Sequence, residues 1–201
     1  MSSSDRQALV VAANRIETGF GAAVTGRVVE TLRGRNRAVV LHDLYAMGFD
    51  PVLSAAERDG YFAGLDEADP RSAAIADLKR SDCLILIYPT WWFGMPAILK
   101  GYIDRLFVPG VAFELDADGT MRQHGLSNIR RLIVITSYGF PRWYVRWIAR
   151  DPGKAFILCG LRPIFARGCA VDWLALHGMD KADLAERTDF LDRVEALVAK
   201  I

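Results

Sequence analysis

Apolar residues along this chain form short continuous runs that alternate with stretches of helical spacing. Continuous runs of about four to eight apolar residues are typical of strands buried on both faces of a parallel sheet. Such runs occupy residues 7–13, 38–42, 83–88, 131–136 and 169–175. Helical spacing follows or precedes them at residues 20–32, 70–78, 97–107, 143–148 and 182–200. This alternation predicts an α/β fold with a doubly wound, five-stranded parallel sheet of strand order 2-1-3-4-5.

One segment, residues 108–126, interrupts the alternation. It consists of VAFEL, then Asp116-Ala117-Asp118-Gly119, then TMRQ. Asp-Gly supplies the positive φ that a tight turn between strands needs, so the segment predicts a short inserted hairpin. Beside the carboxyl edge of the sheet, such a hairpin could cover a substrate pocket or join a dimer contact.

Composition narrows the class of protein. With 201 residues, 52% of them hydrophobic, residues 1–201 are expected to form one domain with a sizeable core. The net charge of +1 gives no electrostatic case for nucleic acid or an anionic membrane. We find neither an apolar run of membrane-spanning length nor a signal-peptide core, so we expect a cytoplasmic protein without a membrane span.

The three cysteines are odd in number and show no C-x-x-C spacing. Cys83, Cys159 and Cys169 have apolar neighbours, which indicates buried free thiols. In the closing helix, five apolar residues are expected to face inward, namely Leu184, Phe190, Leu191, Val194 and Leu197.

The richest stretch for chemistry runs from Asp82 to Phe107. An apolar strand stops at Pro89, which cannot donate to a β-ladder, and Thr90-Trp91-Trp92-Phe93-Gly94 then places three aromatic rings on a turn. In open α/β sheets, ligands bind outside the carboxyl ends of the strands, and exposed rings there suit a flat, partly apolar ligand. The alternative is that these rings pack under a neighbouring loop or at a subunit contact.

A second candidate segment, Asn14 to Gly19, connects the first strand to the helix that begins at Phe20. Backbone N–H groups and the positive end of the helix dipole favour a phosphate at such a position. Thr18 is also a candidate N-cap of the helix. Gly19 and Gly21 form G-x-G, but no third glycine completes the dinucleotide fingerprint of an NAD-binding Rossmann enzyme.

Two motifs carry a family resemblance. YPTWWFGMPAILKGYIDRLF at residues 88–107 and DLYAMGFDP at 43–51 resemble segments of the flavodoxin-like NAD(P)H:quinone oxidoreductases, which include DT-diaphorase and bacterial quinone reductases. The resemblance implies a flavodoxin-like fold, a flavin that is FMN or FAD, NAD(P)H as co-substrate, a quinone or similar flat acceptor, and a homodimer. It also implies that residues 89–94 line the flavin, namely Pro89, Thr90, Trp91, Trp92, Phe93 and Gly94.

The same resemblance implies roles for two further segments. The loop of Ser137, Tyr138 and Gly139 would bind the polar edge of the flavin, and Tyr144 would lie over the ring and steady its reduced form. By their residue types alone, Tyr138 could equally be a packing residue, and the aromatic stripe that contains Tyr144 a core or subunit contact.

The first loop departs from the family pattern. The family usually has a histidine and a serine where this chain has Asn14 and Gly19, and both residues, with Arg15, Thr18 and Phe20, are expected to bind the flavin phosphate. Arg15 could supply a compensating cation, since a guanidinium pairs with phosphate through two hydrogen bonds.

No catalytic triad, metal-ligand spacing or carboxylate pair is evident in the sequence. A flavin that carries the redox chemistry itself would need no such group, which predicts ping-pong hydride transfer from NAD(P)H to an acceptor. Two alternatives stay open: a regulatory subunit of the potassium-efflux type with weak or no flavin turnover, and a Rossmann enzyme without flavin.

Overall fold

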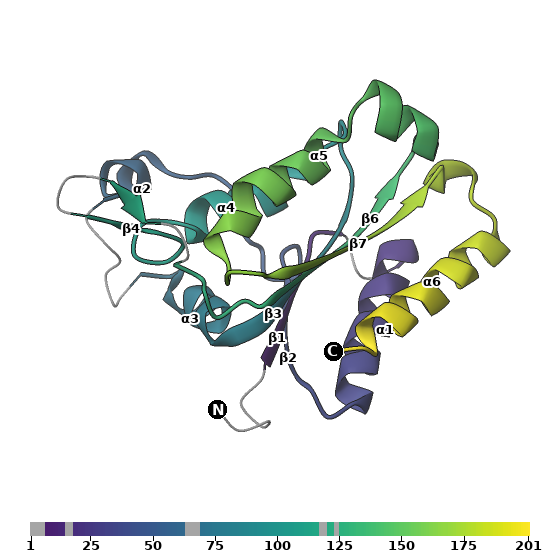
Figure 1. Ribbon diagram of the computed structural model, residues 1–201, viewed down its shortest axis with the longest axis horizontal. Helices are drawn as coiled ribbons and strands as arrows, with labels where there is room; N and C mark the ends of the chain where they lie inside the picture. The colour runs from purple at the N-terminus through teal and green to yellow at the C-terminus, as the bar shows by residue number, and fades with distance from the viewer. Residues whose placement is uncertain (1–6, 15–17, 63–68, 117–119, 123–124) are drawn as a thin grey trace.

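The computed structural model describes residues 7–14, 18–62, 69–116, 120–122 and 125–201. Figure 1 shows a twisted sheet with helices on both faces. Arg15, which was expected to contact phosphate, lies outside the described residues.

The central sheet has five parallel strands in the order β2-β1-β3-β6-β7. Counted along the chain, this is the predicted order 2-1-3-4-5. The strands span β1 Gln7–Ala12, β2 Ala38–Asp43, β3 Ser81–Pro89, β6 Arg131–Tyr138 and β7 Ala170–His177. The fold class predicted from the sequence is confirmed.

Strand β3 shows why its sequence is apolar at nearly every position. Successive side chains of a strand point to opposite faces, so a strand covered on both sides needs apolar residues throughout. Leu84, Leu86 and Tyr88 pack into one hydrophobic cluster, whereas Ile85 and Ile87 pack into the other. The central strand therefore joins the two halves of the core.

The two clusters lie under different helices (Figure 1). One face carries α1 Phe20–Gly34 and α6 Leu184–Val198, and the other carries α3 Ser72–Arg80, α4 Ala97–Leu106 and α5 Pro152–Ala155. Shorter elements are α2 Ala55–Asp59, the π-helical segments η2 Tyr144–Ile148 and η3 Phe156–Leu161, and the 3₁₀ turns η4 Arg162–Ile164 and η5 Met179–Lys181. In the described part of the chain, we find no helix that combines the length and apolarity needed to cross a bilayer.

The inserted hairpin is present as two short antiparallel strands, β4 Glu114–Leu115 and β5 Met121–Arg122. The hairpin prediction is confirmed. Its predicted Asp-Gly turn, Asp118-Gly119, lies outside the described residues.

Two predictions of burial are wrong. Cys83 and Cys169 are buried free thiols, but Cys159 is exposed, because Ile157 and Leu161 are the residues of η3 that turn toward the core. Leu184, the first residue of α6, is 81% exposed, whereas Phe190 and Val194 further along the helix are buried. Apolar neighbours in sequence did not reveal which side of a short or terminal helical turn faces the sheet.

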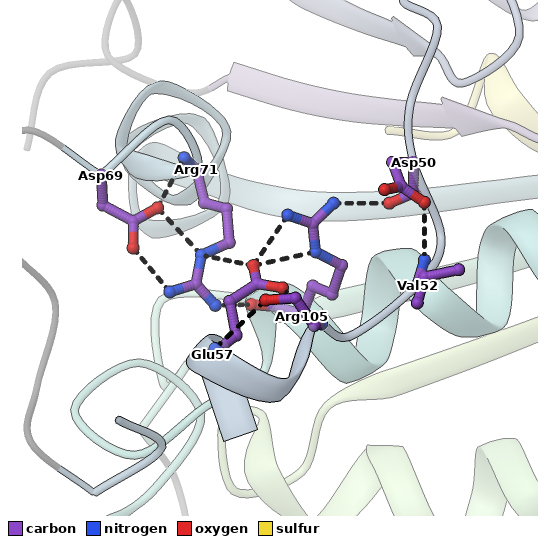
Figure 2. A network of polar contacts seen from close by, with 7 residues as sticks. Asp50, Val52, Glu57, Asp69, Arg71 and Arg105 are labelled. Atoms are coloured by element: carbon purple, nitrogen blue, oxygen red, sulfur yellow. Dashed lines mark hydrogen bonds and ion pairs between the residues drawn. The ribbon is translucent and has the colours of Figure 1, made fainter. Parts of the chain in front are cut away.

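A network of ion pairs fastens the segment around α2 to helix α4 (Figure 2). Arg105 donates to the Glu57 carboxylate at 3.0 and 2.7 Å, and Arg71 donates to the Asp69 carboxylate at 2.9 and 2.5 Å. Arg71 also donates to the Arg105 carbonyl at 2.9 Å, which connects the two pairs. These side chains are mostly buried, so the pairs are screened less than surface ion pairs.

The hydrogen bonds in this network shift carboxyl pKa values. The Arg71 guanidinium holds the pKa of Asp69 below its ordinary value, although burial opposes the shift. Burial alone would raise the pKa of Glu57, but hydrogen bonds from Arg105 and from Ser54 outweigh it, and the pKa of Glu57 is lowered. Both carboxylates are therefore charged at neutral pH.

We expect Arg71→Gln to lower the free energy of unfolding by about 2 kcal/mol at pH 7, because it removes charged hydrogen bonds. A carboxyl with a lowered pKa in the folded state stabilises above its unfolded pKa of about 3.9 and loses that contribution as pH falls through the folded pKa. The difference between wild type and variant should therefore shrink below about pH 4. Urea unfolding across this pH range measures it.

The matched control is Arg80→Gln, since Arg80 is 67% exposed and pairs with Asp77 on the surface of α3. Arg80→Gln should therefore change the free energy of unfolding only slightly. An Arg71→Gln difference that stays constant on acidification would contradict the assignment.

Candidate functional site

The carboxyl ends of β1, β3 and β6 bring three loops together. The Ala13 N–H donates to the Ile87 carbonyl at 2.9 Å, so the first loop leaves the sheet beside β3. The N–H and the hydroxyl of Thr90 both donate to the Ser137 carbonyl, at 2.9 and 2.8 Å. The predicted site segments at 14–20, 89–94 and 137–139 thus meet at one edge of the sheet.

Residues 91–94 form a tight turn closed by two hydrogen bonds. The Trp91 N–H donates to the Gly94 carbonyl and the Gly94 N–H to the Trp91 carbonyl, both at 2.9 Å. Trp92 and Phe93 have φ of 50° and 60°, as in a type I′ turn, which asparagine and glycine normally occupy. Left-handed backbone costs about 1–2 kcal/mol per L-residue, so contacts elsewhere must hold this turn in place.

Helix α5 supplies one such contact. The Gly153 N–H donates to the Phe93 carbonyl at 3.0 Å. A methyl group on Gly153 would lie 2.6 Å from the same oxygen, so only glycine permits this approach. The Phe93 ring adds contacts, with centroids 5.2 Å from Phe140 and 6.0 Å from Tyr144.

The turn presents its two indoles to solvent. Trp91 is 63% exposed and Trp92 is 93% exposed in the chain. For the two indoles, the alternative of packing under a neighbouring loop of the same chain is therefore wrong, and a contact with a second subunit is still open. The Phe93 ring, in contrast, does pack against Phe140 and Tyr144. In the described part of the chain, the N–H groups of Trp92, Phe93 and Gly139 have no hydrogen-bond acceptor, so they are available to a ligand.

The surroundings of the Tyr138 ring differ from those expected of a ring that contacts a ligand. Its side chain is buried, and its hydroxyl donates to Asp151 Oδ1 at 2.9 Å. Burial, and then the Asp151 charge, raise the pKa of Tyr138. Of the two interpretations of its ring, packing is the one that this geometry favours.

Asp151 connects Tyr138 to the aromatic turn. It has φ of 44°, caps α5 and accepts from the Lys154 N–H at 3.2 Å as well as from Tyr138. From the sequence, Asp151-Pro152-Gly153 indicates only the end of a helix, so the anchoring roles of Asp151 and Gly153 were not predicted. An Asp before a proline at the first helical position is nevertheless an N-cap signal.

Tyr144 lies in η2 and stacks on Phe140, with centroids 4.8 Å apart and ring planes at 24°. With Phe93, the rings of Phe140 and Tyr144 form an aromatic cluster next to the loop of Ser137, Tyr138 and Gly139. The predicted site residue Tyr144 is therefore brought to the turn, whereas Trp143 and Trp147 of the same stripe are exposed. Phe140 is a further site residue that the sequence reasoning did not select.

The first loop borders a cavity of about 210 Å³ between α1, α6 and the sheet. Asn14, Phe20, Pro89 and Ser137 are among its walls. Of the buried polar atoms that lack hydrogen-bond partners in the described structure, Asn14 Oδ1 and Thr136 Oγ1 belong to residues that line this cavity. Unpaired buried polar atoms are costly, so their presence points to a ligand that completes their hydrogen bonds.

The start of α1 suits an anion. Gly19 is the N-cap, with φ of 99°, so Thr18 is not the cap that the sequence also allowed, and no side chain among the described residues caps the helix. The first turn contains no acidic residue. Gly21 leaves room for the Asn14 side chain, because a methyl group there would lie 2.7 Å from Asn14 Nδ2. Free helical N–H groups and the helix dipole favour a phosphate here.

The sheet order defines a doubly wound α/β protein, and the candidate site lies at the carboxyl edge of its sheet. A family model described as Flavodoxin-like fold matches residues 6–196. The chain belongs to this flavodoxin-like family.

Individual proteins extend the comparison. NAD(P)H dehydrogenase [quinone] 1 of Cavia porcellus is 31% identical over 156 residues, which cover 69% of this chain and 56% of that protein. The chain thus spans little more than half the length of this relative. The crystal structure of Smu.1420 from Streptococcus mutans UA159 is 29% identical, with a TM-score of 0.80, and the match covers 97% of this chain and 100% of that one.

A more distant structure is an FMN-dependent NADH-azoreductase of Bacillus anthracis in complex with FMN. It is 18% identical with a TM-score of 0.65, and the match covers 97% of this chain and 98% of that chain. At this identity, the likeness shows a shared fold.

We expect Gly153→Ala to lower the free energy of unfolding by about 1–3 kcal/mol, because the added methyl group forces Phe93 away from α5. The turn carries two tryptophans, so the near-ultraviolet circular dichroism of the native protein should change as well. Chemical denaturation and the spectrum together measure the effect.

Gly26→Ala in α1 is the control, since a methyl group there meets no atom within 4 Å. It should leave the spectrum unchanged and raise stability by up to about 1 kcal/mol. Equal effects of the two substitutions would argue against the role of Gly153.

Proposed function

We propose that this chain is a flavin-dependent NAD(P)H:quinone oxidoreductase that works by ping-pong hydride transfer. One arrangement carries the proposal: the cavity with unpaired Asn14 Oδ1 and Thr136 Oγ1 opens at the same sheet edge as the fixed, exposed aromatic turn. A phosphate-bearing ligand with a flat ring needs such a pair of features. The name of the Cavia porcellus relative and the FMN of the Bacillus anthracis structure support the same assignment.

The proposed cofactor is FMN or FAD. Its phosphate would lie at the start of α1, against the N–H groups that follow Gly19, with Asn14, Thr18, Phe20 and the neighbouring Arg15 around it. Its ring would lie along the turn that runs from Pro89 through Thr90, Trp91, Trp92 and Phe93 to Gly94. The free N–H groups of Trp92, Phe93 and Gly139 would bond its polar edge, with Ser137 and Tyr138 in the same loop beside it.

The bound flavin would supply the redox chemistry, in which NAD(P)H, a proton and a quinone give NAD(P)⁺ and a hydroquinone. The chain's own contribution is to bind and orient. Phe93, held by Gly153 and by the rings of Phe140 and Tyr144, fixes the turn, and a fixed surface favours the close contact that hydride transfer requires. We assign the Tyr144 hydroxyl the role of a hydrogen-bond donor toward the bound ring.

A homodimer in the cytoplasm completes the proposal. A second copy is the proposed cover for the apolar rings that this chain exposes beside the site, including Trp91, Trp143 and Trp147. NAD(P)H is a co-substrate in this scheme, so the expected location is one that supplies it.

The test is to titrate FMN and FAD into the apo-protein and to follow NAD(P)H oxidation with menadione. The expected results are saturable binding of one flavin, and parallel double-reciprocal plots when donor and acceptor are varied. Flavin binding without turnover would instead favour a regulatory subunit of the potassium-efflux type. A protein that binds neither flavin contradicts the oxidoreductase and leaves the regulatory subunit.

We expect Asn14→Leu to weaken flavin binding by about 5- to 30-fold, because the amide loses its bonds to the ligand. Stability should change little, since Asn14 Oδ1 is already unpaired and the Asn14 Nδ2 bond to Thr25 is long, at 3.4 Å. Fluorescence titration and thermal unfolding of the apo-protein give the two readouts. Loss of stability with unchanged flavin affinity would make Asn14 a packing residue.

We expect Tyr144→Phe to reduce kcat about 10-fold and to leave flavin affinity within about 3-fold, because it deletes one hydrogen bond and keeps the ring stack. Stopped-flow rates of the donor and acceptor half-reactions would locate the effect. An unchanged kcat would limit Tyr144 to packing.

A further inference from the structure

A second, strongly basic cavity lies beside the edge strand β7. Its volume is about 740 Å³, and its walls come from η2, α5, β7 and α6. Five cations line it: Arg142, Arg146, Arg150, Lys154 and Arg193. We refer to it as the arginine cavity.

The positive charge of the arginine cavity is not balanced by the chain around it. Asp151 is its one acidic wall residue, and Tyr138 and the Lys154 N–H already occupy Asp151 Oδ1. Within the described residues, Arg142, Arg146, Arg150 and Lys154 form no ion pair, and Arg193 has a single long one to Asp189 at 3.7 Å. Like charges gathered in a hollow favour an anion.

The cavity adjoins the proposed flavin site. Arg142 and Arg146 flank Tyr144, whose ring belongs to the aromatic cluster. On the other side, His177 lines the cavity while its ring stacks on Tyr138 at the end of β6, with centroids 4.9 Å apart. The aromatic cluster and the arginine cavity therefore adjoin at Tyr144 and its neighbours Arg142 and Arg146, and at the stacked rings of Tyr138 and His177.

His177 adds an unpaired group to the cavity wall. Its Nδ1 is buried and has no hydrogen-bond partner in the described structure. Burial, and then the charge of Arg142, lower the pKa of His177, so the ring is neutral at pH 7. The wall thus offers one unsatisfied neutral group among several cations.

We propose that the arginine cavity binds the 2′-phosphate at the adenosine end of NADPH, and that it thereby selects NADPH over NADH as the donor. This inference rests on the proposed function, because it concerns the donor of that reaction. NADPH carries a 2′-phosphate that NADH lacks, and a phosphate monoester holds a charge of about −1.5 to −2 at pH 7. Guanidinium groups bind such a phosphate through paired, charged hydrogen bonds.

The extended shape of the donor fits this placement. Its nicotinamide must reach the aromatic turn for hydride transfer, whereas its phosphates need a cationic site further away. The start of α1 would be taken by the flavin phosphate. The arginine cavity supplies a separate anion site on the other side of Tyr144.

The experiment measures binding of adenosine 2′,5′-bisphosphate and of adenosine 5′-monophosphate by calorimetry, with wild type and an Arg142→Gln/Arg146→Gln variant. We expect tighter binding of the bisphosphate, and a loss of about 10- to 100-fold in its affinity in the variant. Affinity for the monophosphate should fall much less. Equal affinity of wild type for the two nucleotides, or bisphosphate binding that the variant retains, would overturn the proposal.

Kinetics with flavin and menadione provide the second readout. In the variant, kcat/KM for NADPH should fall about 10- to 100-fold through KM, whereas kcat/KM for NADH and the flavin Kd should stay near wild-type values. An equal loss for both donors would contradict selection through the 2′-phosphate. The matched control is Arg33→Gln on α1, which is not among the cavity walls. It should leave kcat/KM unchanged for both NADPH and NADH.

The two proposals fail in different ways. Bisphosphate binding that depends on Arg142 and Arg146, in a protein that never oxidises NAD(P)H with added flavin, would support the anion site and contradict the oxidoreductase. Flavin turnover with no preference for NADPH would support the oxidoreductase and contradict the anion site.

Discussion

The hydrogen bond from the Gly153 N–H to the Phe93 carbonyl is the constraint on which the candidate site depends. It joins the turn after β3 to helix α5, two segments far apart in sequence. Trp92 and Phe93 occupy left-handed backbone that costs free energy, and a turn of this composition persists only where its surroundings over-determine it. Asp151 extends the same constraint to Tyr138 in β6, so the sheet itself positions the aromatic surface.

The start of the first loop differs from the aromatic turn. The Asn14 side-chain oxygen has no hydrogen-bond partner among the described residues, whereas hydrogen bonds hold the backbone of the turn. Asn14 is buried, yet its oxygen has no partner in the described structure, and the N-terminus of α1 has no side-chain cap. A stable fold normally avoids both features. Both features lie at the sheet edge where the proposed flavin phosphate would bind, and a ligand that completed these hydrogen bonds would offset their free-energy cost.

Most of the fold could be predicted from periodicity. The five apolar runs specify buried parallel strands, and the sheet order, the flanking helices and the hairpin agree with that pattern. The position of the aromatic turn was also predictable, because Pro89 ends a buried strand. Its shape was not, since neither tryptophan nor phenylalanine signals positive φ, and the partner that enforces it, Gly153, lies in a distant segment.

The prediction was weakest for single side chains whose orientation depends on packing between elements. The exposure of Cys159 and the burial of Tyr138 illustrate this, because each lies in a stretch where apolar residues occur on both sides. The arginine cavity was not predictable at all. Its cations come from η2, α5, α6 and the residues on either side of η2, and their convergence follows from the placement of these segments around β7.

The same cations bear on the protein's behaviour at high concentration. In the described part of the chain, strand β7 ends the sheet and pairs on one side only, so its outer edge offers a template for another strand. Charged side chains beside such an edge repel an identical edge on another molecule. Arg146, Arg150, Lys154 and Arg193 lie beside β7, and their like charge disfavours aggregation of the folded chain through its last strand.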